Sequence, residues 1–260
     1  MSHAPPLHAS VSQTSPEPVA ASPSRRTSLL AGVLYLVTFA TSVPTLLLYG
    51  PLDGRDFALG VGSPTSVLAG ATLEVLLALS CVGTAVVLFP VVKQQSESAA
   101  LGYLAARLVE GALILVGVGS LLSVITLRRD AAQLDDPSLV TAGQTLVAIH
   151  ERLFLLSQSL MPVFCALFLG WALYRSRLVP RAIPLVGLAG APLLLASDTA
   201  ILWGSYSPDS TLAMLGALPI ALWELSLAFW LLARGFLPAP PGAVPTQDHR
   251  PESADDEALA

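Results

Sequence analysis

The chain has 260 residues, of which 53% are hydrophobic and only 12% charged, about half the charged fraction usual in soluble proteins. The formal net charge is −5, which argues against a nucleic-acid partner, because such a partner needs clustered lysine and arginine. Together with a mean hydropathy of +0.68, this composition is typical of a protein that crosses a membrane several times.

The two ends of the chain differ from the rest. Residues 1–24 are rich in Pro, Ser, Ala and Thr and lack aliphatic periodicity, so we expect a disordered tail. After residue 237 the stretch "LPAPPGAVP" cannot continue a helix, and the chain ends in the acidic "DHRPESADDEALA". We therefore expect a second disordered tail over 238–260 and one membrane domain over 25–237.

Six apolar stretches are each long enough for a membrane helix, which needs about 20 residues. They lie at about 28–49, 66–90, 100–127, 145–174, 183–203 and 211–233. The predicted fold class is all-α, a polytopic bundle of six transmembrane helices. Asp136 as N-cap and Pro137 at the first helical position predict that the fourth helix begins outside the bilayer. Proline residues within the spans predict kinks; they are Pro44, Pro162, Pro192 and Pro219.

Basic residues near the span ends predict the orientation, because cytoplasmic loops carry an excess of Lys and Arg. With the N-terminus inside, the cytoplasmic side holds Arg25, Arg26, Lys93, Arg175, Arg177, Arg181 and Arg234. The outer side holds Arg55, Arg128 and Arg129. Both termini are therefore predicted to be cytoplasmic. Aromatic residues near span ends are interpreted as interfacial anchors; they are Tyr49, Trp171, Tyr174 and Trp203.

The first span has two interpretations. Paired arginines before an apolar run, as in "SRRTSLLAGVLYL", occur in twin-arginine export signals. The run is as long as a full span, which exceeds the apolar core of a signal peptide, and five more spans follow. We favour a retained first span, and whether it is ever cleaved stays open.

Ionisable residues inside membrane spans usually lie in the bundle interior and are candidates for function. Glu224 lies near the middle of the sixth span, and Glu110 roughly 7 Å to the cytoplasmic side of its span's centre. Arg107 is one turn nearer the cytoplasm on the same helix face as Glu110. We predict that Arg107 bridges Glu110 and Glu224, and that its long side chain extends partly toward the cytoplasm.

A second set of polar residues is displaced toward the outer side. Glu74 and Asp198 each lie roughly 6–8 Å outside the centre of their spans. His150, Glu151 and Arg152 enter near the outer interface, where Arg152 is the one cation predicted to balance the carboxylates. The sequence thus predicts two polar layers, each with one arginine and an excess of carboxylates.

Three interpretations of these layers remain open. Polar pairs between membrane helices can hold register, at about 1 kcal/mol each; the layers can also form a proton, ion or substrate path, or a catalytic site. The enzyme option has no motif behind it, since Phe154 stands where "HERLF" would need a second metal-binding histidine. Cys81 and Cys165 lack metal-site or disulfide spacing and are interpreted as reduced packing residues. No metal site or cofactor is predicted.

Several segments resemble a bacterial integral-membrane family catalogued as domain of unknown function 4386. They are "AGVLYLVTFATSVPTLLLYGPL", "LEVLLALSCVGTAVVLFPVVK", "LGYLAARLVEGALILVG", "LYRSRLVPRAIPLVGLAGAPLLLAS" and "LPIALWELSLAFWLL". The likeness covers about 28–236. It implies six spans and a bacterial cell (inner) membrane location, and it implies no catalytic residue, cofactor or ligand.

The "YRSRLVPRAIP" loop has two interpretations, which can hold together. Arg175, Arg177 and Arg181 can bind anionic lipid head groups, or they serve only to keep a short loop inside. Taken together, the sequence favours a non-enzymatic accessory or partner-binding membrane protein whose protein partner is unknown. The alternative is a small proton- or ion-coupled transporter that uses Glu110, Glu224 and Arg107.

Overall fold

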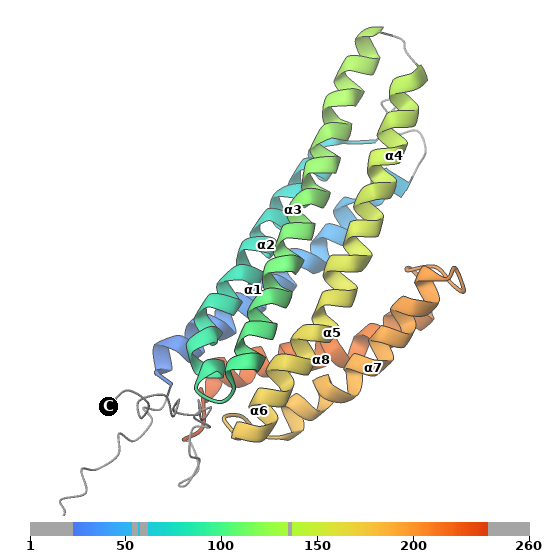
Figure 1. The fold of residues 1–260 in the computed structure, drawn as a ribbon. Helices are drawn as coiled ribbons and strands as arrows, with labels where there is room; N and C mark the ends of the chain where they lie inside the picture. The colour runs from blue at the N-terminus through green and yellow to red at the C-terminus, as the bar shows by residue number, and fades with distance from the viewer. Residues whose placement is uncertain (1–22, 54–56, 58–61, 135–136, 239–260) are drawn as a thin grey trace, which may run out of the picture.

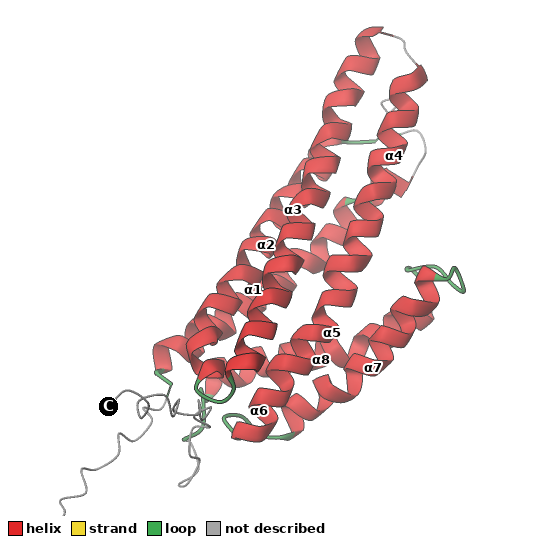
Figure 2. Ribbon diagram, in the orientation of Figure 1, coloured by secondary structure: helices red, strands yellow, loops and turns green. Residues whose placement is uncertain are grey.

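The computed structural model describes residues 23–53, 57, 62–134 and 137–238. Across these residues the chain is helical, with no strand, and six helical segments are long and apolar enough to cross a membrane (Figure 2). The predicted all-α six-span fold class is therefore confirmed. The predicted tails and the N-cap residue Asp136 lie almost wholly outside the described residues, so these predictions stay untested.

The helices follow one another with short connections (Figure 1). The first three spans are α1 (Arg25–Leu48), α2 (Pro64–Lys93) and α3 (Glu97–Leu134), with a short 3₁₀ turn η1 (Gly50–Asp53) after α1. The fourth span combines α4 (Pro137–Phe154), η2 (Leu155–Leu160), α5 (Met161–Cys165), η3 (Ala166–Gly170) and α6 (Trp171–Ser176). The last two are α7 (Ala182–Leu202) and α8 (Thr211–Ala233).

Several helix ends are set by local sequence. The Ser24 and Ser210 hydroxyls accept hydrogen bonds from backbone N–H groups in the first turns of α1 and α8, which would otherwise lack partners. α2 begins at Pro64, whose fixed φ suits the first turn of a helix. α6 ends because Arg177 adopts a left-handed conformation, with φ 57°.

The start of α1 and the end of α8 lie together. The Arg25 guanidinium donates to the Leu231 carbonyl at 2.8 Å and also to the carbonyls of Leu232 and Ala233, which lie in the last turn of α8. A cation at this position is favourable, because the last carbonyls of a helix carry partial negative charge. We call this the terminal end of the bundle and the opposite side, where α7 joins α8, the distal end.

At the distal end the helices separate into two groups (Figure 1). α3 and α4 run side by side and extend beyond the other helices. α7 and α8 form a hairpin that packs on the bundle near the terminal end and diverges from α4 toward the distal end. The bundle is thus tightest near the terminal end and opens distally.

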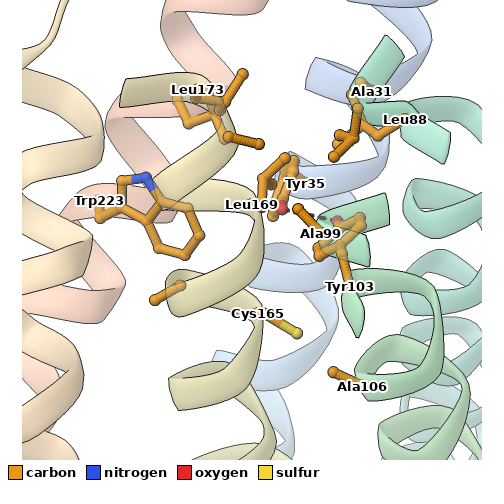
Figure 3. Close-up of a cluster of buried hydrophobic side chains, with 14 of the residues drawn as sticks. Ala31, Tyr35, Leu88, Ala99, Tyr103, Ala106, Cys165, Leu169, Leu173 and Trp223 are labelled. Atoms are coloured by element: carbon orange, nitrogen blue, oxygen red, sulfur yellow. Dashed lines mark hydrogen bonds between the residues drawn. The ribbon is translucent and has the colours of Figure 1, made fainter. Parts of the chain in front are cut away.

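A large apolar cluster fills the half of the bundle nearer the terminal end (Figure 3). Its largest fully buried side chain is Trp223 in α8, which packs directly on Gly187 in α7. A Cβ at residue 187 would lie 2.5 Å from the indole ring, so the absence of a side chain there permits this close approach. Tyr35 and Tyr103 lie in the same cluster and share a hydrogen bond of 2.9 Å between their hydroxyls.

Candidate functional site

Two residues of α3 and one of α8 form an inner polar cluster. Arg107 and Glu110 share one face of α3 because they are three residues apart. Arg107 Nη1 donates to the Glu110 oxygens at 3.2 and 3.0 Å, and Nη2 donates to Glu224 Oε1 at 2.7 Å. Arg107 and Glu110 are only 2% and 4% exposed. The predicted bridge between the two carboxylates is therefore present in the structure.

Because Arg107 is buried, its long side chain does not reach water at the terminal end. Its guanidinium carbon lies 5.2 Å from the centre of the Tyr35 ring and 5.8 Å from that of Tyr103, which is one turn nearer the terminal end. Two carboxylates and two aromatic rings hold the cation inside the bundle. These four groups take the place of the water that would solvate the guanidinium at the membrane surface.

The two cysteines complete the surroundings of Glu110. The Cys81 thiol of α2 donates to Glu110 Oε1 at 3.6 Å, and the Cys165 thiol of α5 donates to Oε2 at 3.9 Å. Both are buried free thiols, as expected of packing residues. Their contact with a carboxylate was not anticipated, because the sequence does not specify which face of each helix meets Glu110.

In the outer set, Glu74 of α2 accepts hydrogen bonds from three side chains and is 1% exposed. Tyr49 Oη donates at 2.9 Å and Gln158 Nε2 at 3.3 Å, and His150 Nε2 lies 3.1 Å from the carboxylate. The rings of Tyr49 and His150 pack edge to face with centres 5.2 Å apart. Tyr49, interpreted from the sequence as an interfacial anchor, is therefore a partner of Glu74.

The predicted role of Arg152 in this layer is wrong. Arg152 and Glu151 are exposed, and within the described residues no ion pair joins Arg152 to Glu74 or Asp198. His150 occupies the position beside Glu74 instead and is 6% exposed. Adjacent residues on a helix project about 100° apart, so only one of the three neighbouring polar side chains reaches the bundle interior.

Asp198 of α7 is separate from Glu74. It is 1% exposed, and its Oδ1 accepts a hydrogen bond of 2.5 Å from Ser159 Oγ. Its second oxygen, Oδ2, is buried and receives no hydrogen bond from the described residues. The two outer carboxylates, predicted to share one layer, thus have different partners that are adjacent in sequence, Gln158 and Ser159.

Gln158 and Ser159 lie in η2, a widened π-helical turn in the middle of the fourth span. The cause is Pro162, which has no N–H to donate to the Gln158 carbonyl and whose ring would clash with it. π turns inside α-helices often occur at functional sites. Here the turn positions neighbouring side chains against carboxylates on different helices, Glu74 on α2 and Asp198 on α7.

A cavity of about 150 Å³ lies between the inner cluster and η2. Arg107, Glu110 and Glu224 contribute to its wall, and so do Gln158 and Ser159. The remaining lining residues come from α1, α2, α5, α7 and α8, and they are Thr38, Phe39, Ser42, Leu77, Pro162, Leu194, Ala217, Ile220 and Ala221. Along α1, the lining residues Thr38, Phe39 and Ser42 lie on the distal side of Tyr35. The cavity therefore lies between the inner cluster and two side chains, Gln158 and Ser159, that contact the outer carboxylates Glu74 and Asp198.

The three arginines of the α6–α7 connection lie at the terminal end and do not belong to the cavity lining. Arg175, Arg177 and Arg181 are exposed, whereas Leu178 and Val179 between them are buried. The Arg175 guanidinium lies 5.8 Å from the centre of the Trp171 ring. The loop is thus anchored by apolar residues while its cations remain accessible.

Comparison with known proteins identifies a family. A model of the family described as Domain of unknown function (DUF4386) matches residues 30–235, which include every residue of the cavity wall. The chain belongs to this family. Its members are thereby expected to share the six-span bundle. No match was found among curated proteins or solved structures.

Within the described part of the chain, no group of three His, Cys, Asp or Glu residues is placed to hold a metal ion. The contacts that the structure shows among the buried charged side chains are ion pairs and hydrogen bonds.

Proposed function

We propose that this membrane protein binds a small polar solute in the cavity and moves it across the membrane, with proton exchange at Glu224. The observation that supports this proposal is the cavity itself, with charged side chains in its wall near the middle of the bundle. Apolar packing would fill such a space if the ion pairs served only to hold helices in register. The cavity thus favours the transport alternative over an accessory protein with purely structural polar layers.

Glu224 is the suitable residue for proton exchange. Its side chain is 13% exposed, against 2% for Arg107 and 5% for Glu110, so it is the member of the ion-pair network most open to the cavity. Its Oε1 accepts from Arg107, while no hydrogen bond from the described residues reaches Oε2. A proton or a solute can therefore bind at Oε2 while the link to Arg107 persists.

The arrangement of helices suggests how access would change. The apolar cluster with Tyr35, Tyr103 and Trp223 closes the terminal side of the cavity, while α7 and α8 diverge from the rest distally. Movement of the α7–α8 hairpin against the other helices would alternately expose the cavity at each end, as rocking of one helix group does in transporters. Glu224 lies on this hairpin and Arg107 on the other group, so their ion pair joins the two parts.

Proton exchange is tested with the full chain reconstituted in liposomes that contain a pH-sensitive dye and carry an imposed membrane potential. We expect proton uptake by the wild type and a loss of at least about tenfold in Glu224→Gln, because the neutral amide cannot exchange a proton. The matched control is Glu97→Gln, which changes an exposed carboxylate paired with Lys93 and is expected to retain full uptake. Equal uptake by wild type and Glu224→Gln would rule out this role.

The orientation and location remain proposals: a bacterial cell (inner) membrane, with the terminal end in the cytoplasm. Support comes from the basic residues gathered at that end, including Arg25 and the three arginines of the α6–α7 connection, which suit the phosphates of anionic lipids. A cysteine introduced at either Arg177 or Ser207, which are exposed at opposite ends, tests it with a membrane-impermeant thiol reagent, since the native Cys81 and Cys165 are buried. We expect labelling of Ser207→Cys in intact cells and of Arg177→Cys only after lysis. The reverse pattern would invert the topology.

A further inference from the structure

We infer that the solute bound in the cavity is a small organic cation, an alkylammonium or a similar protonated amine. This inference rests on the proposed function and adds the chemical class of the solute. Three features of the cavity wall support it: its net charge, the kind of hydrogen-bonding groups left without partners, and the presence of an apolar, aromatic part.

The charge of the wall is negative. Arg107 is the one cation among the lining residues, whereas Glu110 and Glu224 are two carboxylates. The ionisable groups behind the wall do not reverse this balance, because Glu74 is paired with His150 and Asp198 has Ser159 as its partner. With the carboxylates ionised, the wall carries one excess negative charge in a low-dielectric region. A bound cation would neutralise it, as would a proton.

The hydrogen-bonding groups of the wall are mainly acceptors. A carboxylate only accepts, so the amide nitrogen of Gln158 must be the atom that contacts Glu74, which leaves the Gln158 carbonyl oxygen available. Ser159 already donates its hydroxyl proton to Asp198, and Thr38 donates its proton to the Tyr35 carbonyl at 2.7 Å. Their oxygens retain only lone pairs.

The donors of the wall are largely engaged. Arg107 uses both terminal nitrogens on carboxylates. Its Nε–H has no partner, but protein atoms cover it, so it is not accessible to a ligand. Glu224 Oε2 and the Gln158 carbonyl oxygen therefore remain as the strong hydrogen-bond acceptors available to a ligand, together with hydroxyl oxygens. A solute rich in N–H donors fits this wall, whereas an anion would meet carboxylates and lone pairs.

The rest of the wall favours an organic cation over a bare metal ion. Phe39 contributes an aromatic ring, and Leu77, Leu194 and Ile220 contribute aliphatic side chains. Aromatic rings attract ammonium groups, and aliphatic walls suit an alkyl chain. The volume of about 150 Å³ holds several water molecules or one small amine.

Binding is tested on the full chain in detergent by isothermal titration with methylammonium, propylammonium and trimethylammonium chlorides. We expect saturable binding of these cations at a constant ionic strength. Glu224→Gln is expected to weaken it at least tenfold, and Glu97→Gln to leave it unchanged. Phe39→Leu is expected to weaken trimethylammonium binding severalfold more than methylammonium binding, since only the ring provides cation–π attraction.

Other outcomes would overturn the inference. They are equal binding of sodium or potassium ions, preferential binding of acetate or propanol, and no binding of any amine. Failure of amine binding can be distinguished from failure of the proposed function, because the liposome experiment measures proton uptake without amines. Uptake without amine binding would retain the transport proposal with a different solute. Amine binding without uptake would retain this site in a protein that does not exchange protons.

Discussion

Replacing Arg107 by methionine is expected to destabilise the folded bundle by about 3–5 kcal/mol, because removing one partner leaves buried carboxylates uncompensated. Glu110 would lose the cation paired with it, and Glu224 would lose its hydrogen bond of 2.7 Å. Methionine retains only the aliphatic part of the side chain, so the contacts of the guanidinium with the rings of Tyr35 and Tyr103 are lost together with the charge. The measurement is the free energy of unfolding of the full chain in mixed micelles.

Two further variants separate charge from packing. Arg26→Met removes an exposed arginine at the terminal end and is expected to change stability by less than about 0.5 kcal/mol. The triple variant Arg107→Met, Glu110→Leu and Glu224→Leu removes the whole network. It is expected to be more stable than Arg107→Met alone, since replacing a complete buried ion-pair network by apolar groups is often neutral. A triple variant less stable than the single one would contradict this account.

Replacing Glu74 by leucine is expected to destabilise the bundle by about 2 kcal/mol, since each hydrogen bond between membrane helices contributes about 0.6 kcal/mol on average. Three donors from three different segments lose their acceptor: Tyr49, His150 and Gln158. Glu74→Gln keeps one acceptor oxygen and is expected to cost less. The same unfolding measurement applies.

The control for this prediction is Glu97→Leu, which makes the same change at an exposed site. Glu97 and Lys93 have side chains that are 60% and 50% exposed, so their ion pair contributes little. We expect a loss of less than about 0.5 kcal/mol. Equal losses in Glu74→Leu and Glu97→Leu would show that the hydrogen bonds to Glu74 add nothing to stability.

Sequence reasoning located the membrane helices well for a physical reason. A helix that crosses lipid must satisfy its backbone hydrogen bonds internally and present apolar side chains over about 20 residues, and both requirements are local. The last span, predicted at 211–233, coincides with Thr211–Ala233. The third was predicted as 100–127, whereas α3 runs from Glu97 to Leu134, because the helix continues beyond the apolar stretch and packs beside α4.

The inner cluster was also accessible from the sequence. Arg107 and Glu110 share a helix face by spacing alone, and depth counting places Glu224 near their level. A buried arginine in an apolar bundle needs carboxylate partners, which left few candidates. Burial of the Arg107 guanidinium was not evident from the sequence, since one of the tyrosines that surround it, Tyr35, lies on another helix, α1.

The outer residues show what only the tertiary structure decided. The rotation of α4 about its axis decides which of His150, Glu151 and Arg152 reaches Glu74. Counting residues along a span gives the depth of a side chain but not this rotation. Gln158 was overlooked, although a glutamine inside an apolar span was a signal. Its contact with Glu74 depends on the π-helical turn before Pro162.

By itself, therefore, the sequence determined the six spans and their approximate limits, since hydropathy and helical rise are properties of single segments. The tertiary structure decided which side chains meet, that Glu74 and Asp198 have separate partners, and that a cavity lies between the two sets. These features depend on helix rotation and on the divergence of α7 and α8 from the other helices. Both arise from packing between segments distant in the chain.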